Sequence, residues 1–275
     1  MEIAERQGQI AGIDVLWRVA GDAPILYLHG VPAAGWHWEP FLARTGGIAP
    51  DLPGFGGSGK PGDFDYSIEG YDRFLEDFLD ELGIERVRLV MHDWGGVGLA
   101  FAQRLPERVH RIVLMNAVPF LPGYRWHRTA RIWRTPLLGE LSMGITSRRV
   151  LRLLSRESNA TPGPMPEPWL DSVLDHFDQG TQRAILRLYR NSPSDVLAAA
   201  GATLSELDVP ALVVWGERDP YIAPAFGEAF ARTLPRAELL VAAGAGHWPW
   251  VDGAEDVVGR VASFLSDGNS RSGNP

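Results

Sequence analysis

The carboxylate of Asp93 stands where a buried strand is expected to give way to a helix. The preceding run Val87–Met91 is apolar, and Gly95 and Gly96 follow the aspartate. A sharp turn between strand and helix lifts one side chain above a sheet, and small residues after it let the helix pack closely. This context favours a carboxylate nucleophile, although an aspartate here could instead only cap the following helix.

A second acid and a histidine follow Asp93 in an order that suits nucleophilic catalysis. Asp219 and His247 each come shortly after an apolar run. An acid that fixes the tautomer of a histidine lets the imidazole act as a base. The sequence predicts a triad of Asp93, Asp219 and His247, with Glu217, or Asn116 or a neighbour, as alternative positions for the acid.

Backbone donors for an oxyanion are expected from two loops. The segment His29-Gly-Val-Pro32 follows an apolar run, and Trp94 follows the predicted nucleophile. The N–H groups of Val31 and Trp94 would converge on the reacting oxygen, because backbone donors are rigid and already point into such a turn. His29 is expected to support this loop.

The elements that would position these residues have the pattern of an α/β fold. Several short runs are rich in Val, Ile and Leu and barely alternate, which is typical of parallel strands buried on both faces. Helical patterns over Ile68–Leu82, which ends at Gly83, and over Gly95–Leu105 lie between some of them. The expected strands are Asp14–Val19, Ile25–Leu28, Val87–Met91, Ile112–Met115, Ala211–Trp215 and Leu239–Val241.

The pattern changes between about Pro119 and Ser205, where the strand signal disappears. Arg-rich helical stretches over Thr146–Arg156 and Thr181–Tyr189 flank a Pro- and Gly-rich loop, Thr161–Trp169. We expect a helical lid inserted into the core. The predicted organisation is a first core part over 1–118, the lid over 119–205, a second core part over 206–266, and a disordered tail over 267–275.

Composition narrows the function classes. The net charge of −8 disfavours binding to nucleic acid or to a membrane surface, and the lack of cysteine excludes disulfides and thiolate chemistry. The sequence has no signal-peptide pattern and no long apolar span, so a cytoplasmic protein is expected. The Gly-rich segment Asp51–Gly59 lacks the order of a phosphate-binding loop, and no metal spacing occurs, so we predict neither cofactor nor metal.

Four motifs together resemble the α/β-hydrolase-fold epoxide hydrolases, whose close relatives are the haloalkane dehalogenases. The resemblance extends from His29 to about Asp252 and is weaker in the lid. It implies the α/β-hydrolase fold, with a mostly parallel central sheet flanked by helices and an inserted helical lid. The motifs are His29-Gly-Val-Pro32, Asp51-Leu-Pro-Gly-Phe-Gly-Gly-Ser58, His92-Asp-Trp-Gly-Gly96 and Gly246-His-Trp248.

The lid is expected to carry the acid that polarises an epoxide ring. The resemblance implies this role for Tyr189, in the segment Leu188-Tyr-Arg-Asn191, although a tyrosine here could simply pack in the core. The family usually has a second lid tyrosine. Tyr124 is the other tyrosine of this lid, and His127 or His176 could substitute for it. Predicted substrate contacts are His29, Pro32, Tyr124, His127 and Trp248.

The resemblance predicts an epoxide hydrolase that forms a vicinal diol. Asp93 would attack the ring carbon while Tyr189 hydrogen-bonds to the oxygen, and water activated by His247 would hydrolyse the alkyl-enzyme ester. No cofactor is implied, and the partners are a small-molecule substrate and water.

Other functions remain open. A haloalkane dehalogenase needs donors for a halide, and the side chain of Val31 cannot supply one. Trp94 with Trp126, Trp133 or Trp169 could form a two-indole clamp. A carboxylate-nucleophile hydrolase acting on another electrophile, such as a haloacid, and a non-catalytic binding protein are further alternatives.

Overall fold

The computed structural model describes residues 1–159, 165–252 and 256–266, and these are built around one sheet. The strands are β1 (Ala4–Ile10), β2 (Ile13–Ala20), β3 (Ile25–Leu28), β4 (Gly47–Pro50), β5 (Val87–His92), β6 (Val109–Met115), β7 (Ala211–Gly216) and β8 (Ala237–Ala242). Their order in the sheet is β1-β2-β4-β3-β5-β6-β7-β8, and β2 pairs antiparallel with both of its neighbours. The other pairs are parallel, so the predicted fold class is confirmed.

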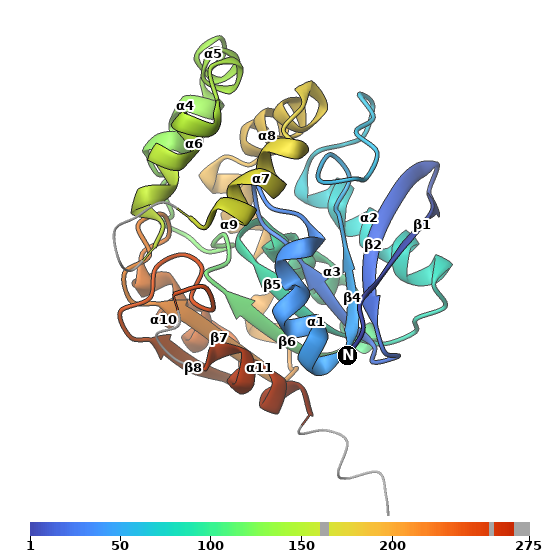
Figure 1. Ribbon diagram of the computed structural model, residues 1–275. Coiled ribbons are helices and arrows are strands. Elements are labelled where there is room, and N and C mark those ends of the chain that lie inside the picture. Colours follow the sequence, from blue (N-terminus) through green and yellow to red (C-terminus); the bar gives the residue numbers. More distant parts are fainter. Residues whose placement is uncertain (160–164, 253–255, 267–275) are drawn as a thin grey trace, which may run out of the picture.

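Helices cover both faces of this sheet (Figure 1). Those beside it are α1 (Glu39–Thr45), α2 (Ile68–Glu81), α3 (Gly98–Arg104), α10 (Pro224–Thr233) and α11 (Val257–Ser266). Six more are described between β6 and β7, and Figure 1 shows one of them, α5, at the end of the molecule away from the sheet. They are α4 (Arg128–Arg134), α5 (Leu138–Gly144), α6 (Arg148–Leu154), α7 (Glu167–Asp175), α8 (Gln179–Asn191) and α9 (Ser194–Ala200).

Alternate residues of the central strands enter two separate cores. In β5, Leu89 and Met91 join the core under α2 and α3, whereas Val90 joins the core under α1 and α11. Successive side chains of a strand point to opposite faces, so a strand covered by helices on both sides must be apolar throughout. This is why β3, β5 and β7 could be predicted from continuous apolar runs.

Helix α2 begins and ends at the signals expected of it. The side chain of Ser67 accepts a hydrogen bond from the N–H of Gly70 at 3.0 Å, which caps the first turn. Gly83 has φ +65° just after the helix, a conformation in which a side chain would be strained. The predicted helix over Ile68–Leu82 and its glycine stop are therefore confirmed.

The edges of the sheet differ from the prediction. The runs predicted for β2 and β8 were expected to be buried on both faces, but Leu239 and Val241 are 39% and 44% exposed. Strand β8 is an edge strand, so one of its faces is only partly covered. Strands β1 and β4 were missed, because β1 is largely polar and exposed, and β4 is a four-residue strand with Gly and Pro at its ends.

The region between β6 and β7 contains no strand among its described residues. Part of the loop predicted over Thr161–Trp169 is wrong, since Glu167–Trp169 form the first turn of α7, which has a proline at its start. Residues 160–164 and the predicted tail 267–275 lie outside the described residues. The lid limits at 119 and 205 stay a prediction. Across the described ranges, no helix is long and apolar enough to cross a membrane.

Candidate active site

Asp93 occupies a strained turn directly after β5. Its φ of +49° lies in the left-handed region, and the 3₁₀ helix Asp93–Val97 starts at this residue. A Cβ on Gly95 would come within 2.0 Å of the carbonyl oxygen of Leu28, so only glycine fits beside β3. The N-cap of the 3₁₀ helix is His92. The interpretation of Asp93 as a mere helix cap is therefore wrong.

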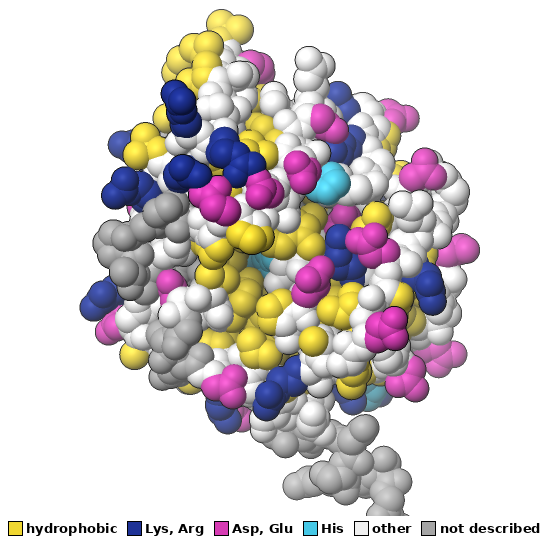
Figure 2. Space-filling view, viewed as in Figure 1, with side chains coloured by type: hydrophobic (Ala, Val, Ile, Leu, Met, Phe, Trp, Pro, Cys, Tyr) yellow, Lys and Arg dark blue, Asp and Glu magenta, His cyan; other side chains and the backbone are white. Residues whose placement is uncertain are grey.

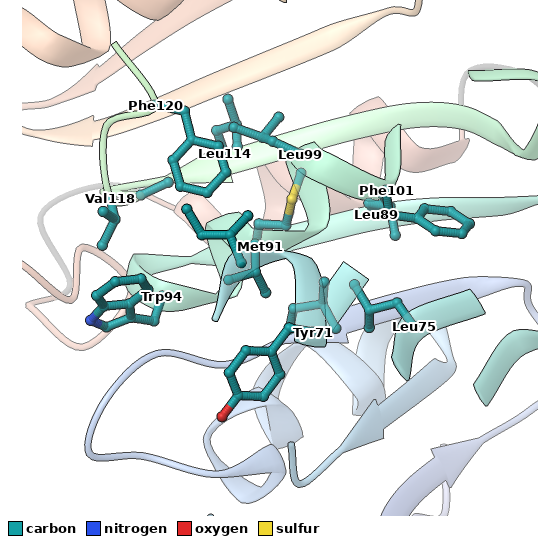
Figure 3. Packing of buried hydrophobic residues seen from close by; sticks show 14 of the residues in the cluster. Tyr71, Leu75, Leu89, Met91, Trp94, Leu99, Phe101, Leu114, Val118 and Phe120 are labelled. Atoms are coloured by element: carbon teal, nitrogen blue, oxygen red, sulfur yellow. The ribbon is translucent and has the colours of Figure 1, made fainter. Parts of the chain in front are cut away.

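Met91 shows how an atypically large residue fits two positions before this turn. It is fully buried among Leu89, Leu99 and Leu114 (Figure 3). A Cβ on Gly98 would lie 2.9 Å from its sulfur and 2.7 Å from a methyl carbon of Leu28. The space for Met91 thus comes from a glycine on the adjoining helix α3.

The residues of the predicted triad lie together at the carboxyl ends of β5, β7 and β8. His247 Nε2 is 3.7 Å from Asp93 Oδ2, and His247 Nδ1 is 2.8 Å from Asp219 Oδ2. The other carboxylate oxygen of Asp93, Oδ1, accepts a hydrogen bond from the N–H of Val31 at 2.9 Å. All three side chains are buried. One oxygen of Asp93 is therefore held by backbone, and the other faces the imidazole.

Asp219 is fixed by several donors besides the histidine. Its Oδ1 accepts from the N–H groups of Tyr221 at 2.8 Å and Ile222 at 3.1 Å. The side-chain amide of Asn116 donates to its Oδ2 at 2.6 Å. The alternative acid Glu217 instead accepts from the N–H of Gly244 at 2.8 Å. The geometry places Asp219, and neither alternative, next to the imidazole.

Two further histidines hold the loops of the site. The Nε2 of His29 accepts from the N–H of Leu52 at 2.9 Å and its Nδ1 donates to the carbonyl of Gly30. The Nε2 of His92 donates to the carbonyl oxygen of His247 at 2.9 Å. Burial lowers the pKa of His92 to about 3, so this ring stays neutral. Both histidines therefore support the site through backbone groups.

The charges of the triad reinforce one another. Burial lowers the pKa of His247, but the carboxylates of Asp219 and Asp93 outweigh burial and raise it to about 10. Burial raises the pKa of Asp93, yet its interaction with His247 leaves that pKa below the ordinary value. The unmodified site thus holds an ionised Asp93 beside a protonated His247. Esterification of Asp93 would remove one of the two anions that keep His247 protonated.

A cavity of about 400 Å³ lies between the triad and the lid helices, and its lining is mostly apolar. The predicted contacts Pro32, Tyr124, His127 and Trp248 line it, as do Asp93, His247 and Tyr189. His29 does not line this cavity, because its ring is turned onto the loop it supports. Tyr221, which also lines the cavity, was missed. Its only signal in the sequence is its place two residues after Asp219.

Aromatic residues from the core and the lid meet beside Asp93. The indole of Trp94 stacks on Trp126 with ring centroids 5.4 Å apart, and its centroid is 5.1 Å from that of Tyr189. Trp126 donates its N–H to the carbonyl of Ser192 at 3.0 Å. The indole N–H of Trp94 and the hydroxyl of Tyr124 are buried with no hydrogen-bond partner among the described residues. Tyr124 lines the cavity, so its hydroxyl is available to a ligand, whereas Trp94 lies outside the cavity lining.

Burial raises the pKa of Tyr189 well above its usual range, and the charge of Asp93 raises it further. Burial also raises the pKa of Tyr124. Both phenols therefore remain protonated near neutral pH and can donate hydrogen bonds. Among the residues that the structure describes, no group of three acidic, His or Cys side chains is placed to hold a metal ion.

Comparison with known proteins places this geometry in a family. The model of the alpha/beta hydrolase family matches residues 25–260, most of the chain. The chain belongs to the alpha/beta hydrolase family. Where a typical esterase or lipase of this fold has serine, this alpha/beta hydrolase has Asp93.

Individual relatives of this alpha/beta hydrolase differ in activity. A haloalkane dehalogenase of Bradyrhizobium diazoefficiens is 31% identical over 97% of this chain and 95% of its own length. Epoxide hydrolase 3 of Mus musculus is 28% identical over 90% of this chain and 72% of its own length. The crystal structure of the haloalkane dehalogenase DbeA from Bradyrhizobium elkani has a TM-score of 0.84 at 28% identity, covering 97% of this chain and 98% of its own. The predicted epoxide hydrolase is thus matched less closely than its dehalogenase alternative.

Proposed function

We propose that this hydrolase cleaves a bond between a saturated carbon and a leaving group through an ester on Asp93. The observation that carries the proposal is the carboxylate itself, which has Oδ1 hydrogen-bonded to the N–H of Val31 and Oδ2 facing His247 Nε2 at 3.7 Å. An ionised carboxylate can displace a leaving group from carbon without first losing a proton. This suits an alkyl halide or an epoxide.

The first step forms the alkyl-enzyme ester. Asp93 Oδ2 forms a bond to the substrate carbon while the bond from that carbon to the leaving group breaks and its electron pair departs. Because Asp93 is now neutral, His247 loses part of the field that held its proton. The histidine releases its proton to the solvent and can then act as a base.

The second step hydrolyses the ester. His247, oriented by Asp219, takes a proton from water, and the resulting hydroxide attacks the carboxyl carbon of Asp93. The N–H of Val31, with that of Trp94 as the predicted second donor, stabilises the tetrahedral oxyanion, and each such donor contributes about 3 kcal/mol. His247 returns its proton to the departing alkoxide, which leaves as the alcohol. The carboxylic acid that this leaves on Asp93 gives its proton to His247, which restores the ionised Asp93 beside a protonated histidine.

Alkyl halides are the first substrate class that we propose. The support is the similarity to haloalkane dehalogenases over almost the whole chain. The hydroxyl-bearing side chains of Tyr124 and Tyr189 line the cavity that contains Asp93, and Trp94 packs against Tyr189 from behind. The two hydroxyls would give a halide two donors. A clamp formed with Trp126 is disfavoured, because that N–H is already donated to Ser192.

Epoxides are a second candidate because of the two tyrosines. Tyr124 and Tyr189 line the cavity that contains Asp93. An epoxide oxygen becomes an alkoxide when the ring opens, and it needs a proton as well as a hydrogen bond. A phenol can supply both, whereas a halide needs no proton.

The experiment is a panel of matched alkyl chlorides, bromides and epoxides, with halide release and diol formation measured for the wild type and for Asp93→Ala. Halide release by the wild type, without diol formation, supports alkyl halides as the substrate class. Diol formation by the wild type, without halide release, supports epoxides. Activity that survives in Asp93→Ala would refute the proposed nucleophile. A wild type inactive on the whole panel would count against both substrate classes.

A further inference from the structure

Apolar side chains that face solvent are concentrated in one part of the lid. Of the ten large hydrophobic residues that are strongly exposed in the described chain, six lie between residues 131 and 153, which we call the lid tip. Leu137 is 82% exposed. Single exposed hydrophobic residues are normal on a protein surface, whereas a group of them in one place indicates an interaction site. The six are Ile132, Leu137, Leu138, Leu141, Ile145 and Leu153.

The same region is strongly basic in an acidic protein. Residues 131–153 contain five arginines and one glutamate, whereas the whole chain has 26 basic and 34 acidic residues. Arg148 and Arg152 are paired with Glu167 and Asp171 of α7, and Glu140 is paired with Arg190. Arg131 and Arg149 are exposed, and no ion pair in the described part of the chain engages them. Figure 2 shows hydrophobic side chains at the top of the lid with basic side chains gathered beside them.

The apolar surface of the lid tip continues into the cavity. Ile132 on α4 and Ile145 after α5 are exposed, and both also line the cavity that contains Asp93. Val150 and Leu154 of α6 extend the same lining. An apolar molecule could therefore pass from the lid tip to the nucleophile along hydrophobic side chains.

We propose that the lid tip docks on the surface of a membrane that contains anionic lipid. Exposed Leu and Ile would enter the boundary between headgroups and acyl chains, while the unpaired arginines contact lipid phosphates, as in other interfacial basic helices. The acidic remainder of the molecule would face away from the bilayer. The net charge of −8 led us to expect no membrane binding. That value is an average over a basic lid tip and an acidic remainder of the chain.

A second copy of this chain fits the lid tip less well than an anionic membrane does. A symmetric contact would bring two basic lid tips together, and like charges directly opposed are unfavourable. Docking on a bilayer also gives the cavity mouth access to apolar substrates dissolved in the lipid. That consequence rests on the proposed function, whereas the docking itself does not.

The test is co-sedimentation of the full chain with vesicles of equal parts phosphatidylcholine and phosphatidylglycerol, compared with phosphatidylcholine alone. We expect binding to the anionic vesicles that weakens as salt rises. Arg131→Gln combined with Arg149→Gln should lower the partition coefficient by roughly 30-fold, at about fivefold for each charge. Leu137→Ser combined with Leu141→Ser should lower it to a similar extent. None of these four residues lines the cavity, so turnover of a water-soluble substrate should be unchanged.

The matched control is Arg6→Gln combined with Arg44→Gln, which removes the same charge from exposed positions on the core. It should bind anionic vesicles as the wild type does. Equal binding to both kinds of vesicle, no binding to either, or an equal loss in the control would overturn the proposal. So would a dimer in sedimentation equilibrium that the leucine substitutions abolish, with no vesicle binding. Since sedimentation requires no turnover, its outcome is independent of which bond the site cleaves.

Discussion

Asp219, at the carboxyl edge of the sheet, and two donors on the lid side of the cavity differ in how completely they are hydrogen-bonded. At the sheet edge, Asp219 accepts hydrogen bonds from two backbone N–H groups, an amide and the imidazole of His247. Across the cavity, the hydroxyl of Tyr124 and the indole N–H of Trp169 are buried with no partner in the described ranges. Unpaired buried donors cost about 1–3 kcal/mol each, so they are more readily tolerated where a ligand will pair with them. The carboxylate of Asp219 is fully paired without substrate, whereas these two donors on the lid side are not.

This contrast separates two kinds of specificity. In the proposed mechanism, the core residues carry out a covalent step and a hydrolytic step that are independent of the leaving group. The lid would supply the donors that the leaving group meets and the apolar walls that enclose the rest of the substrate.

The largest effect is expected from breaking the core network at Asp219. Asp219→Asn keeps the shape but lets the imidazole take the wrong tautomer, so turnover should fall by roughly 10⁴-fold. The control Glu217→Gln alters a side chain that only contacts the N–H of Gly244, and it should leave turnover unchanged. Steady-state rates on the best substrate measure both. Equal losses in the two variants would mean that the assignment of the acid is wrong.

The rates of the two chemical steps should respond differently to pH. Because the pKa of Asp93 is lowered, its carboxylate stays ionised as pH falls, and formation of the ester continues. His247 must be neutral to activate water, and protonation below its pKa in the ester should slow hydrolysis about tenfold per pH unit. We therefore expect the alkyl-enzyme to accumulate in the wild type under acidic conditions, measured by quenched-flow mass spectrometry. Ester that disappears as pH falls would contradict this order of steps.

A smaller effect is expected on the lid side of the cavity. Tyr189→Phe removes one donor and should slow ester formation by roughly 10- to 100-fold while the hydrolysis step is unchanged. The effect should be greater for an epoxide than for a bromide, because only the epoxide oxygen needs a proton. Single-turnover kinetics on both substrates measure the two steps. An unchanged rate of ester formation on both would remove Tyr189 from the site, and Tyr124→Phe provides the matching comparison.

The smallest effects concern stability, and they compare the tightly packed core with the exposed lid tip. Gly98→Ala places a methyl group against Leu28 and Met91, and we expect it to lower the free energy of unfolding by about 1–3 kcal/mol. Met91→Ala in the same chain should make the added methyl group less damaging. Leu137→Ser in the exposed lid tip should change stability by no more than about 0.5 kcal/mol. Urea denaturation measures the free energy of unfolding of each variant. Equal losses for Gly98→Ala and Leu137→Ser would contradict this difference between core and lid tip.

The sequence predicted those parts of the fold that have a regular local pattern of residues. The strands β3, β5 and β7 are continuously apolar because both faces are covered, and Asp93 could be recognised from the turn that follows β5. The contact of Asp219 with His247 was predicted from the order of the three residues along the chain and from the apolar runs that precede them. The Asn116 side chain was considered only as the acid, because its hydrogen bond to Asp219 joins strands far apart in the sequence.

The lid was harder to predict for physical reasons. Its helices are short and several contain exposed leucines, so their apolar spacing does not indicate which face meets the core. The convergence of Tyr124, Tyr189 and Tyr221 on one cavity depends on the packing of three separate segments. The position of Trp94 behind Tyr189, outside the lining of that cavity, has no local signal either. These are also the residues that would distinguish a halide from an epoxide.

The most direct test of the central claim is the mass of the intact His247→Gln protein after incubation with a substrate that the wild type turns over. We expect a mass increase equal to the transferred alkyl group, located on Asp93 by peptide mapping and absent when Asp93→Asn is added. An unmodified His247→Gln protein, or an adduct at another residue, would contradict an ester on Asp93 as the intermediate.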